Sequence, residues 1–283
     1  MRPQGDAAPI GLGGRCRIAV RGAALLLTLL ACLPLHYAYR LFAYGSPFPK
    51  LFLFLTARIV GARVRIIGTP LRRDVFFIAN HVSWIDIPAI AGASGTAFVA
   101  KAEIAGAPLI GWLCRLNRTV FVQREARLGV AGQINALREA LADNWSVTVF
   151  PEGTTTDGQS LLPFKTSMLK VLEPPPPGVL VQPVLLDYGA LAPFFGWIGD
   201  ESGASNAARI LARRGSFPLA VHFLEPFSPA EFPGRKAASA EARSRIEVAL
   251  VRALGRPLRP FGLNVEAVRY AAPEAHARAN GDD

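Results

Sequence analysis

The distribution of apolar residues divides the chain into two parts. Long apolar runs cover residues 22–39 and 51–60, whereas shorter runs alternate with polar stretches from residue 62 onward. Short runs of β-branched and aromatic residues are typical of buried strands, and apolar positions three or four apart are typical of helices. The pattern therefore predicts an apolar helical segment at the N-terminus, followed by a domain in which strands and helices alternate.

The second part of the chain predicts an α/β domain. We expect strands at 63–67, 75–79, 97–100, 119–122, 145–150, 179–186 and 219–224, the first at a sheet edge and the sixth interrupted by Pro183. We expect helices at 87–91, 109–116, 130–144, 164–172 and 246–254. Strands interleaved with helices indicate a single domain with a mixed sheet and helices packed on it. We therefore divide the chain into a disordered N-terminus at 1–17, a membrane-associated helical segment at 18–61, the α/β domain at 62–258 and a loose tail at 259–283.

The apolar run at 22–39 has features of a membrane anchor. It contains 18 residues without charge between Arg21 and Arg40, close to the minimum for spanning a bilayer. The second run is too short to span, and cations flank the first run on both sides, so charge does not fix the orientation. A cleaved signal peptide is the alternative, but no small-residue cleavage site follows Pro34. We expect a retained anchor, either a hairpin dipping into the inner leaflet or a second partial crossing.

A histidine and an aspartate follow the strand expected at 75–79. His81 precedes Asp86 by five residues. On a continuous helix these side chains lie about 140° apart and cannot share a proton, so the pair requires a turn. Pro88 favours an extended Ile87 and suits the first position of a following helix. In such a turn the Asp86 carboxylate holds one ring nitrogen of His81 and leaves the other free to accept a proton.

A second polar loop follows the strand expected at 145–150. It reads Phe150-Pro151-Glu152-Gly153-Thr154. Together with Asn80-His81 and Asp86, this loop resembles the glycerolipid acyltransferase family, which contains 1-acylglycerol-3-phosphate acyltransferase and lyso-ornithine lipid acyltransferases. The resemblance covers roughly residues 60–225 and includes the HX4D motif. It implies direct attack of an acceptor hydroxyl on an acyl thioester, with His81 as base, Asp86 as its orienter, and neither cofactor nor metal.

The same resemblance suggests where the lipid acceptor binds. Arg124 matches an arginine tied to the acceptor phosphate, and Lys101 and Lys165 match basic positions less specifically. For all three residues a solvated surface charge is the alternative. Amides around Gly153 are expected to face an anion. The substrate-binding set is Lys101, Arg124, Glu152, Gly153, Thr154, Thr155 and Lys165, with Glu152 orienting the loop because an acidic side chain repels an anionic head group.

One position departs from the family pattern. Thr155 stands where relatives commonly carry an arginine after Glu-Gly-Thr, and threonine has neither the charge nor the fork geometry that binds phosphate. The departure favours an acceptor with a less anionic head group, such as lyso-ornithine lipid. Lysophosphatidate stays the default acceptor, giving phosphatidate, and lyso-ornithine lipid is the alternative.

Composition and charge are consistent with a membrane enzyme. The 283 residues carry a net charge of +10 and are 51% hydrophobic, with a mean hydropathy of +0.28. Apolar and basic character together favour an anionic membrane surface. Nucleic acid is not expected as a partner because the arginines are scattered and no binding signature is present. The three cysteines show no metal or disulfide spacing, which fits a reducing compartment and a location on the cytoplasmic face of the inner membrane.

Two other classes of function remain open. A non-catalytic membrane-binding protein explains the charge and hydropathy but gives no reason for His81 and Asp86 beside a second polar loop. A hydrolase lacks its nucleophile, because the chain has no Gly-x-Ser-x-Gly elbow. The sequence therefore favours a lysolipid O-acyltransferase whose partners are acyl-CoA or acyl carrier protein, a lysolipid and the membrane.

Overall fold

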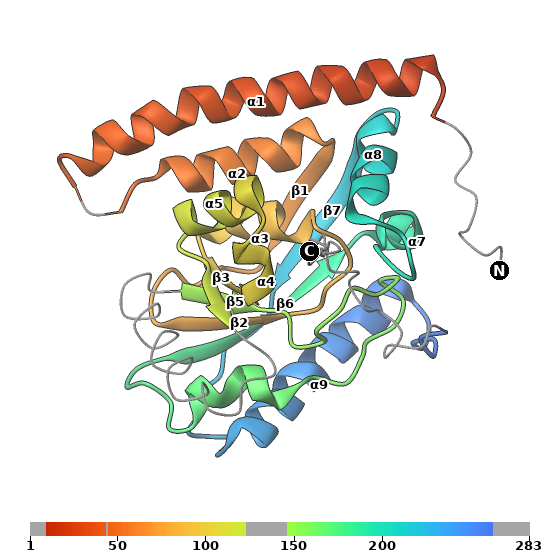
Figure 1. Ribbon diagram of the computed structural model, residues 1–283. Helices are drawn as coiled ribbons and strands as arrows, with labels where there is room; N and C mark the ends of the chain where they lie inside the picture. Colours follow the sequence, from red (N-terminus) through yellow and green to blue (C-terminus); the bar gives the residue numbers. More distant parts are fainter. Residues whose placement is uncertain (1–9, 44, 123–145, 263–283) are drawn as a thin grey trace, which may run out of the picture.

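The computed structural model describes residues 10–43, 45–122 and 146–262, and within them the expected α/β fold is confirmed (Figure 1). A seven-stranded sheet has the order β1-β7-β6-β2-β5-β3-β4. Its strands are β1 (Ala62–Ile67), β2 (Val75–Ala79), β3 (Ala97–Lys101), β4 (Val120–Val122), β5 (Ser146–Val149), β6 (Leu180–Asp187) and β7 (Phe217–Phe223). All neighbours run parallel except β6 and β7, so the sheet is mixed and β1 is an edge strand, as predicted.

The central strand β2 explains where the core lies. All five of its residues are buried, because β5 and β6 flank it and helices cover both faces of the sheet. Phe77 and Ala79 point into one apolar cluster, and Phe76 and Ile78 into the other. This alternation is the period of two that a strand imposes on its side chains.

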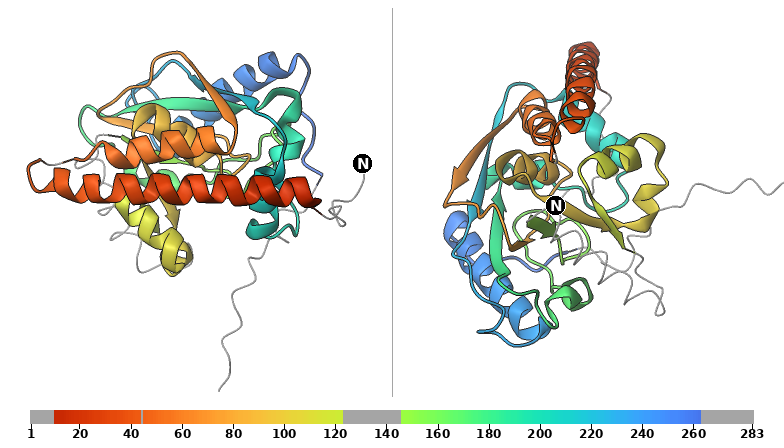
Figure 2. Two further views of the ribbon diagram at one scale, coloured as in Figure 1. Left: turned by 90° about the horizontal axis from the view of Figure 1, so that it is seen from above. Right: turned by 90° about the vertical axis from the view of Figure 1, so that its left-hand side faces the viewer.

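Helices form a layer on each side of the sheet (Figures 1 and 2). On one side lie α1 (Leu12–Arg40), α2 (Phe48–Ile59), α3 (Asp86–Ser94), α7 (Ala192–Phe195) and α8 (Gly203–Ala212), with α4 (Ala102–Ala105) and α5 (Pro108–Leu116) toward the β3–β4 edge. On the other lie the 3₁₀ helix η2 (Thr166–Leu172) and α9 (Arg235–Leu254), and η3 (Gly189–Leu191) precedes α7. Gly92 lets α3 approach α2, since a Cβ there would come 2.8 Å from Phe54 Cα.

The long helix α1 lies along α2 and reaches α8 (Figure 1). Near its start, the Arg17 Nε donates to Ala212 O at 2.6 Å, and Arg21 Nη1 donates to Leu211 O at 2.8 Å and Arg213 O at 3.0 Å. These are carbonyls at the C-terminus of α8, where a helix lacks internal donors and attracts cations. The two arginines therefore fix the beginning of α1 to the domain.

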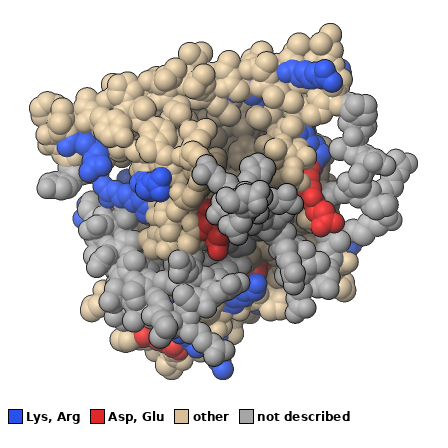
Figure 3. Space-filling view, viewed as in Figure 1, with Lys and Arg blue, Asp and Glu red and all other residues tan. Residues whose placement is uncertain are grey.

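The face of α1 turned away from the domain is apolar. Leu26, Leu27, Leu30 and Leu35 are each at least half exposed. By length and composition α1 is able to cross a membrane, with a mean hydropathy of 2.1 over its most apolar window. In Figure 3 most of the band formed by α1 is uncharged, with basic side chains visible at its N-terminal end on the upper right, and the surface is hollowed beneath it.

Several local expectations were wrong. The first helix begins at Leu12, so residues 12–17 are helical rather than disordered; the contacts of Arg17 and Arg21 with α8 hold this part in place. The helix expected at 164–172 is a 3₁₀ helix over Thr166–Leu172. Strand β6 runs unbroken through Pro183, because the proline lies where the β6–β7 ladder ends and only accepts a bond, from Leu224 N at 2.9 Å. The helix expected at 130–144 lies outside the described residues.

Candidate active site

The candidate site is built at the carboxyl end of the central strand. Asn80 follows β2 and is buried, and its side chain pairs with β6: Asn80 Nδ2 donates to Leu186 O at 3.2 Å, and Leu186 N donates to Asn80 Oδ1 at 2.7 Å. These two bonds continue the contact between β2 and β6 by one residue. His81 therefore leaves the sheet from a fixed position.

His81 and Asp86 meet across the turn that the sequence requires. The His81 Nδ1 lies 2.8 Å from Asp86 Oδ2, and the side chains are 19% and 0% exposed. The imidazole stacks on Phe150 with ring centroids 4.1 Å apart. Among the described residues, no hydrogen-bond partner is seen for the other ring nitrogen, Nε2. The arrangement is that of a base whose orientation is set by a carboxylate.

Asp86 also organises the turn itself. Its Oδ2 accepts from Val82 N at 2.7 Å and Ser83 N at 2.9 Å, while Oδ1 accepts from Tyr188 Oη at 2.5 Å. The helix α3 begins at Asp86, so Ile87 is helical rather than extended as Pro88 led us to expect. A proline is tolerated in the first turn because its missing N–H would have no partner inside the helix.

Glu152 lies beneath His81 and joins the two loops. It is 1% exposed, and its oxygens accept from His81 N at 2.8 Å and Leu162 N at 2.9 Å. Burial raises the pKa of Glu152 to about 8; the Leu162 and His81 amides act in the opposite direction, and the charge of Asp86 adds to the rise. Glu152 therefore joins the two loops through their backbone amides, and its side chain is buried.

Further backbone contacts join the His81 turn to the loops after β5 and α7. Thr156 N donates to His81 O at 2.8 Å, and Trp197 N donates to Val82 O at 3.0 Å. Thr155, expected at the head group, is only 8% exposed, and its hydroxyl donates to Trp197 O. Its side chain therefore positions the loop after α7 and lies below the surface.

The remaining members of the expected substrate-binding set differ in outcome. Gly153 has a φ of 75°, which glycine adopts readily, and Gly153 N donates to Phe150 O at 3.1 Å within the turn. Thr154 is partly exposed beside it. Lys165 is exposed, and its backbone N donates to Pro151 O at 2.8 Å, which brings it next to the second loop. Lys101 ends β3 as expected, but its side chain, like the whole of Arg124, lies outside the described residues.

Tyr188 is a site residue that the sequence reasoning missed. It follows β6 directly and reaches Asp86 from a distance of 102 residues along the chain. The available signal was its place after a buried strand, because polar residues at the carboxyl ends of neighbouring parallel strands meet at one sheet edge. The sequence reasoning also gave no role to Thr156, which follows the Glu-Gly-Thr motif and contacts the His81 backbone.

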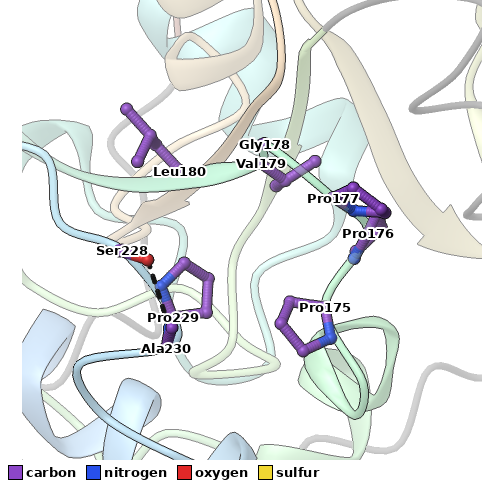
Figure 4. A pocket seen from close by; sticks show the side chains of 9 residues that line it. All are labelled: Pro175, Pro176, Pro177, Gly178, Val179, Leu180, Ser228, Pro229 and Ala230. Carbon is purple, nitrogen blue, oxygen red and sulfur yellow. Dashed lines mark hydrogen bonds between the residues drawn. The ribbon is translucent and has the colours of Figure 1, made fainter.

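A separate pocket at the opposite end of β6 is not part of this site (Figure 4). The lining residues are Pro175, Pro176, Pro177, Gly178, Val179, Leu180, Ser228, Pro229 and Ala230. None of these side chains is titratable, and Ser228 Oγ is the acceptor of a bond from Ala230 N at 3.3 Å. Its lining therefore offers no acid or base that could activate the Ser228 hydroxyl.

Comparisons with known proteins identify the family of this chain. The Acyltransferase family profile matches residues 63–187. A lyso-ornithine lipid O-acyltransferase of Rhodobacter capsulatus is 35% identical over 263 residues, covering 84% of this chain and 92% of the relative. A 1-acyl-sn-glycerol-3-phosphate acyltransferase of Neisseria gonorrhoeae is 38% identical over 96 residues, covering 34% of this chain and 38% of the relative.

The fold has a counterpart among solved structures. The crystal structure of the 1-acyl-sn-glycerophosphate acyltransferase from Thermotoga maritima matches with a TM-score of 0.57 at 22% identity, over 83% of this chain and 97% of that one. The matched range 63–187 of this chain contains His81, Asp86 and Glu152. The Rhodobacter relative extends the similarity to 84% of the chain. The protein therefore belongs to the acyltransferase family and is an acyltransferase.

Proposed function

We propose that the protein is a membrane-bound lysolipid O-acyltransferase that transfers an acyl chain from a thioester donor to the hydroxyl of lyso-ornithine lipid. The observation that carries the proposal is the His81–Asp86 pair: one imidazole nitrogen is held at 2.8 Å by a buried carboxylate, and the other is open to a substrate hydroxyl. A hydrolase with a serine nucleophile is not supported, because the chain contains no Gly-x-Ser-x-Gly elbow.

The chemistry follows from the positions of these groups. His81 Nε2 takes the proton of the acceptor hydroxyl as its oxygen attacks the thioester carbonyl, and the new ester forms when the thiolate leaves. Asp86 stabilises the imidazolium that exists between these steps and keeps the proton on Nδ1. The proton on Nε2 then neutralises the departing thiolate, so the protein returns to its starting state.

The acceptor is inferred from one contact and one relative. At position 155, where related sequences carry an arginine, the side chain is a buried threonine bonded to Trp197 O, so this position offers no cation to a phosphate. The Rhodobacter capsulatus relative, which matches most of the chain, is a lyso-ornithine lipid O-acyltransferase. We therefore rank lyso-ornithine lipid above lysophosphatidate, reversing the default from the sequence. Lysophosphatidate is the second candidate because the Neisseria gonorrhoeae relative is a 1-acyl-sn-glycerol-3-phosphate acyltransferase, with Arg124 as the proposed phosphate ligand.

The experiment is a transfer assay with the purified full-length protein in detergent or lipid vesicles. Lyso-ornithine lipid and lysophosphatidate are each offered with acyl-CoA and with acyl carrier protein as donor, and His81→Ala is the control. We expect lyso-ornithine lipid to have the higher kcat/KM, and His81→Ala to lose about 10²- to 10⁴-fold in rate. A higher kcat/KM for lysophosphatidate would establish the second candidate. An active His81→Ala protein would overturn the mechanism.

We also propose that the protein binds the cytoplasmic face of the inner membrane through α1 and α2. α1 exposes Leu26, Leu27, Leu30 and Leu35, and α2, which packs along α1, exposes Leu51 and Phe54. The arginine contacts that tie α1 to α8 favour the interfacial hairpin over an upright single crossing. In that arrangement the site stays on the side of the membrane where cytosolic acyl donors are found.

A further inference from the structure

Tyr188 completes the hydrogen bonding of the Asp86 carboxylate. Oδ2 is shared by His81 Nδ1, Val82 N and Ser83 N, whereas Oδ1 accepts from Tyr188 Oη at 2.5 Å. Asp86 is 0% exposed, so its carboxylate depends on donors of the protein for its hydrogen bonds. A buried carboxylate that loses one donor is destabilised as an anion.

The protein holds the phenol ring of Tyr188 in a fixed place. Tyr188 is 1% exposed, and its ring stacks with Phe195 at 5.3 Å and with Phe217 at 6.3 Å between centroids. Burial, followed by the charge of Asp86 and the hydrogen bond to it, raises the pKa of Tyr188 well above its ordinary value. The hydroxyl therefore keeps its proton and acts as a donor to Asp86.

We propose that Tyr188 is a positioning residue for acyl transfer: its hydroxyl fixes the rotamer of Asp86 and withdraws part of the carboxylate charge, which sets how readily His81 gives up a proton. The proposal rests on the acyl transfer by His81 and Asp86 proposed above. Tyr188 acts through Asp86 and does not contact substrate.

The effect on pH dependence has a defined sign. Within residues 10–43, 45–122 and 146–262, the titratable groups that face the His81–Asp86 pair are Tyr188 after β6 and Glu152 after β5, with Arg243 of α9 acting on Glu152. Without the Tyr188 hydroxyl the pair binds its shared proton more tightly, whether the proton rests on the imidazole or on the carboxylate. The active, proton-free base then appears only at higher pH.

The test is Tyr188→Phe in the full-length protein, since phenylalanine keeps the ring stacking and removes only the hydroxyl. The matched control is Thr148→Val, which removes a buried hydroxyl bonded to Thr96 at 3.0 Å within the sheet. For Tyr188→Phe we expect a roughly 10- to 100-fold fall in kcat, the range for a hydrogen bond to a charged group. The KM values of donor and acceptor should stay within about twofold, and the acid limb of the kcat/KM profile should move up by about one pH unit. Thr148→Val should show neither change.

A second readout does not depend on turnover. Diethyl pyrocarbonate modifies neutral imidazole, and mass spectrometry of the peptide containing His81 gives its rate of modification against pH. The midpoint for His81 should move to higher pH in Tyr188→Phe and stay unchanged in Thr148→Val. If wild type is active and Tyr188→Phe has both an unchanged kcat and an unchanged modification midpoint for His81, the proposed role of Tyr188 is wrong. An inactive wild type, or an active His81→Ala, would instead overturn the proposed function.

Discussion

Replacing Asp86 by asparagine separates the two tasks of this carboxylate. The asparagine amide oxygen can take the place of Oδ2 and accept from His81 Nδ1, Val82 N and Ser83 N, as the carboxylate does at 2.7 to 2.9 Å. The amide nitrogen then faces Tyr188 Oη, whose oxygen accepts instead of donating. The turn is therefore preserved, and the negative charge opposite the imidazolium is lost.

The structure gives different magnitudes for Asn and Ala at this position. Asp86→Asn should lower kcat by about 10²- to 10⁴-fold, because the base loses the charge that orients and stabilises it. The free energy of unfolding should fall by about 1 kcal/mol. Asp86→Ala should be equally inactive, but it leaves four buried donors without an acceptor. Its cost should be about 3 to 5 kcal/mol, because breaking a buried ionic network outweighs the recovered desolvation. In a domain of this size the loss corresponds to a fall in Tm of roughly 10 °C.

The assay combines initial rates with thermal unfolding of the same detergent-solubilised preparations. Wild type, Asp86→Asn and Asp86→Ala are compared at one detergent and lipid concentration, since bound lipid changes Tm. The reasoning is refuted if Asp86→Asn unfolds at as low a temperature as Asp86→Ala, because the turn would then depend on the charge. It is also refuted if Asp86→Asn keeps wild-type kcat.

Two further predictions concern Glu152 and membrane attachment. Because burial raises the pKa of Glu152 to about 8, the folded state binds its proton more tightly than the unfolded state; the stability from this group is full below about pH 4.5 and is lost as pH rises through about 8. The free energy of unfolding, measured with urea between these pH values, should fall by up to about 1.4 kcal/mol per pH unit. Glu152→Gln should remove this fall. An equal dependence of the free energy of unfolding on pH in both proteins would contradict the raised pKa of Glu152. Washing membranes with high salt should not release the protein, because salt screens charge contacts and leaves apolar burial intact; release into the wash, measured by immunoblot, would show that α1 and α2 are core helices.

The parts of the fold set by local pattern were predictable from the sequence. The central strand at 75–79 was predicted from its continuous apolar run, which reflects burial on both faces. The edge strand was predicted at 63–67 from alternation with period two, and the structure places it at 62–67. The His81–Asp86 pair was equally accessible, since a five-residue spacing after a strand requires a turn, and the turn brings the side chains to 2.8 Å.

The remaining features depend on contacts between distant segments. Leu12–Arg17 is helical because two arginines meet the end of α8, about 190 residues later, and no local pattern records that partner. Tyr188 reaches Asp86 only because β6 lies beside β2 in the sheet. The burial of Thr155 follows from its contact with Trp197, so a motif comparison that placed it at the head group had no means of predicting its direction.

The backbone of His81 is held at both ends by the second loop, through Glu152 on its N–H and Thr156 on its carbonyl. The two motifs, 71 residues apart between His81 and Glu152, therefore depend on each other for their geometry and form one structural unit. A chimera that joins two acyltransferases between β2 and β5 would pair a His81 turn from one parent with the loop containing Glu152 and Thr156 from the other. Exchange of acceptor preference between relatives is better attempted with crossover points outside residues 80–162, so that both loops come from the same parent.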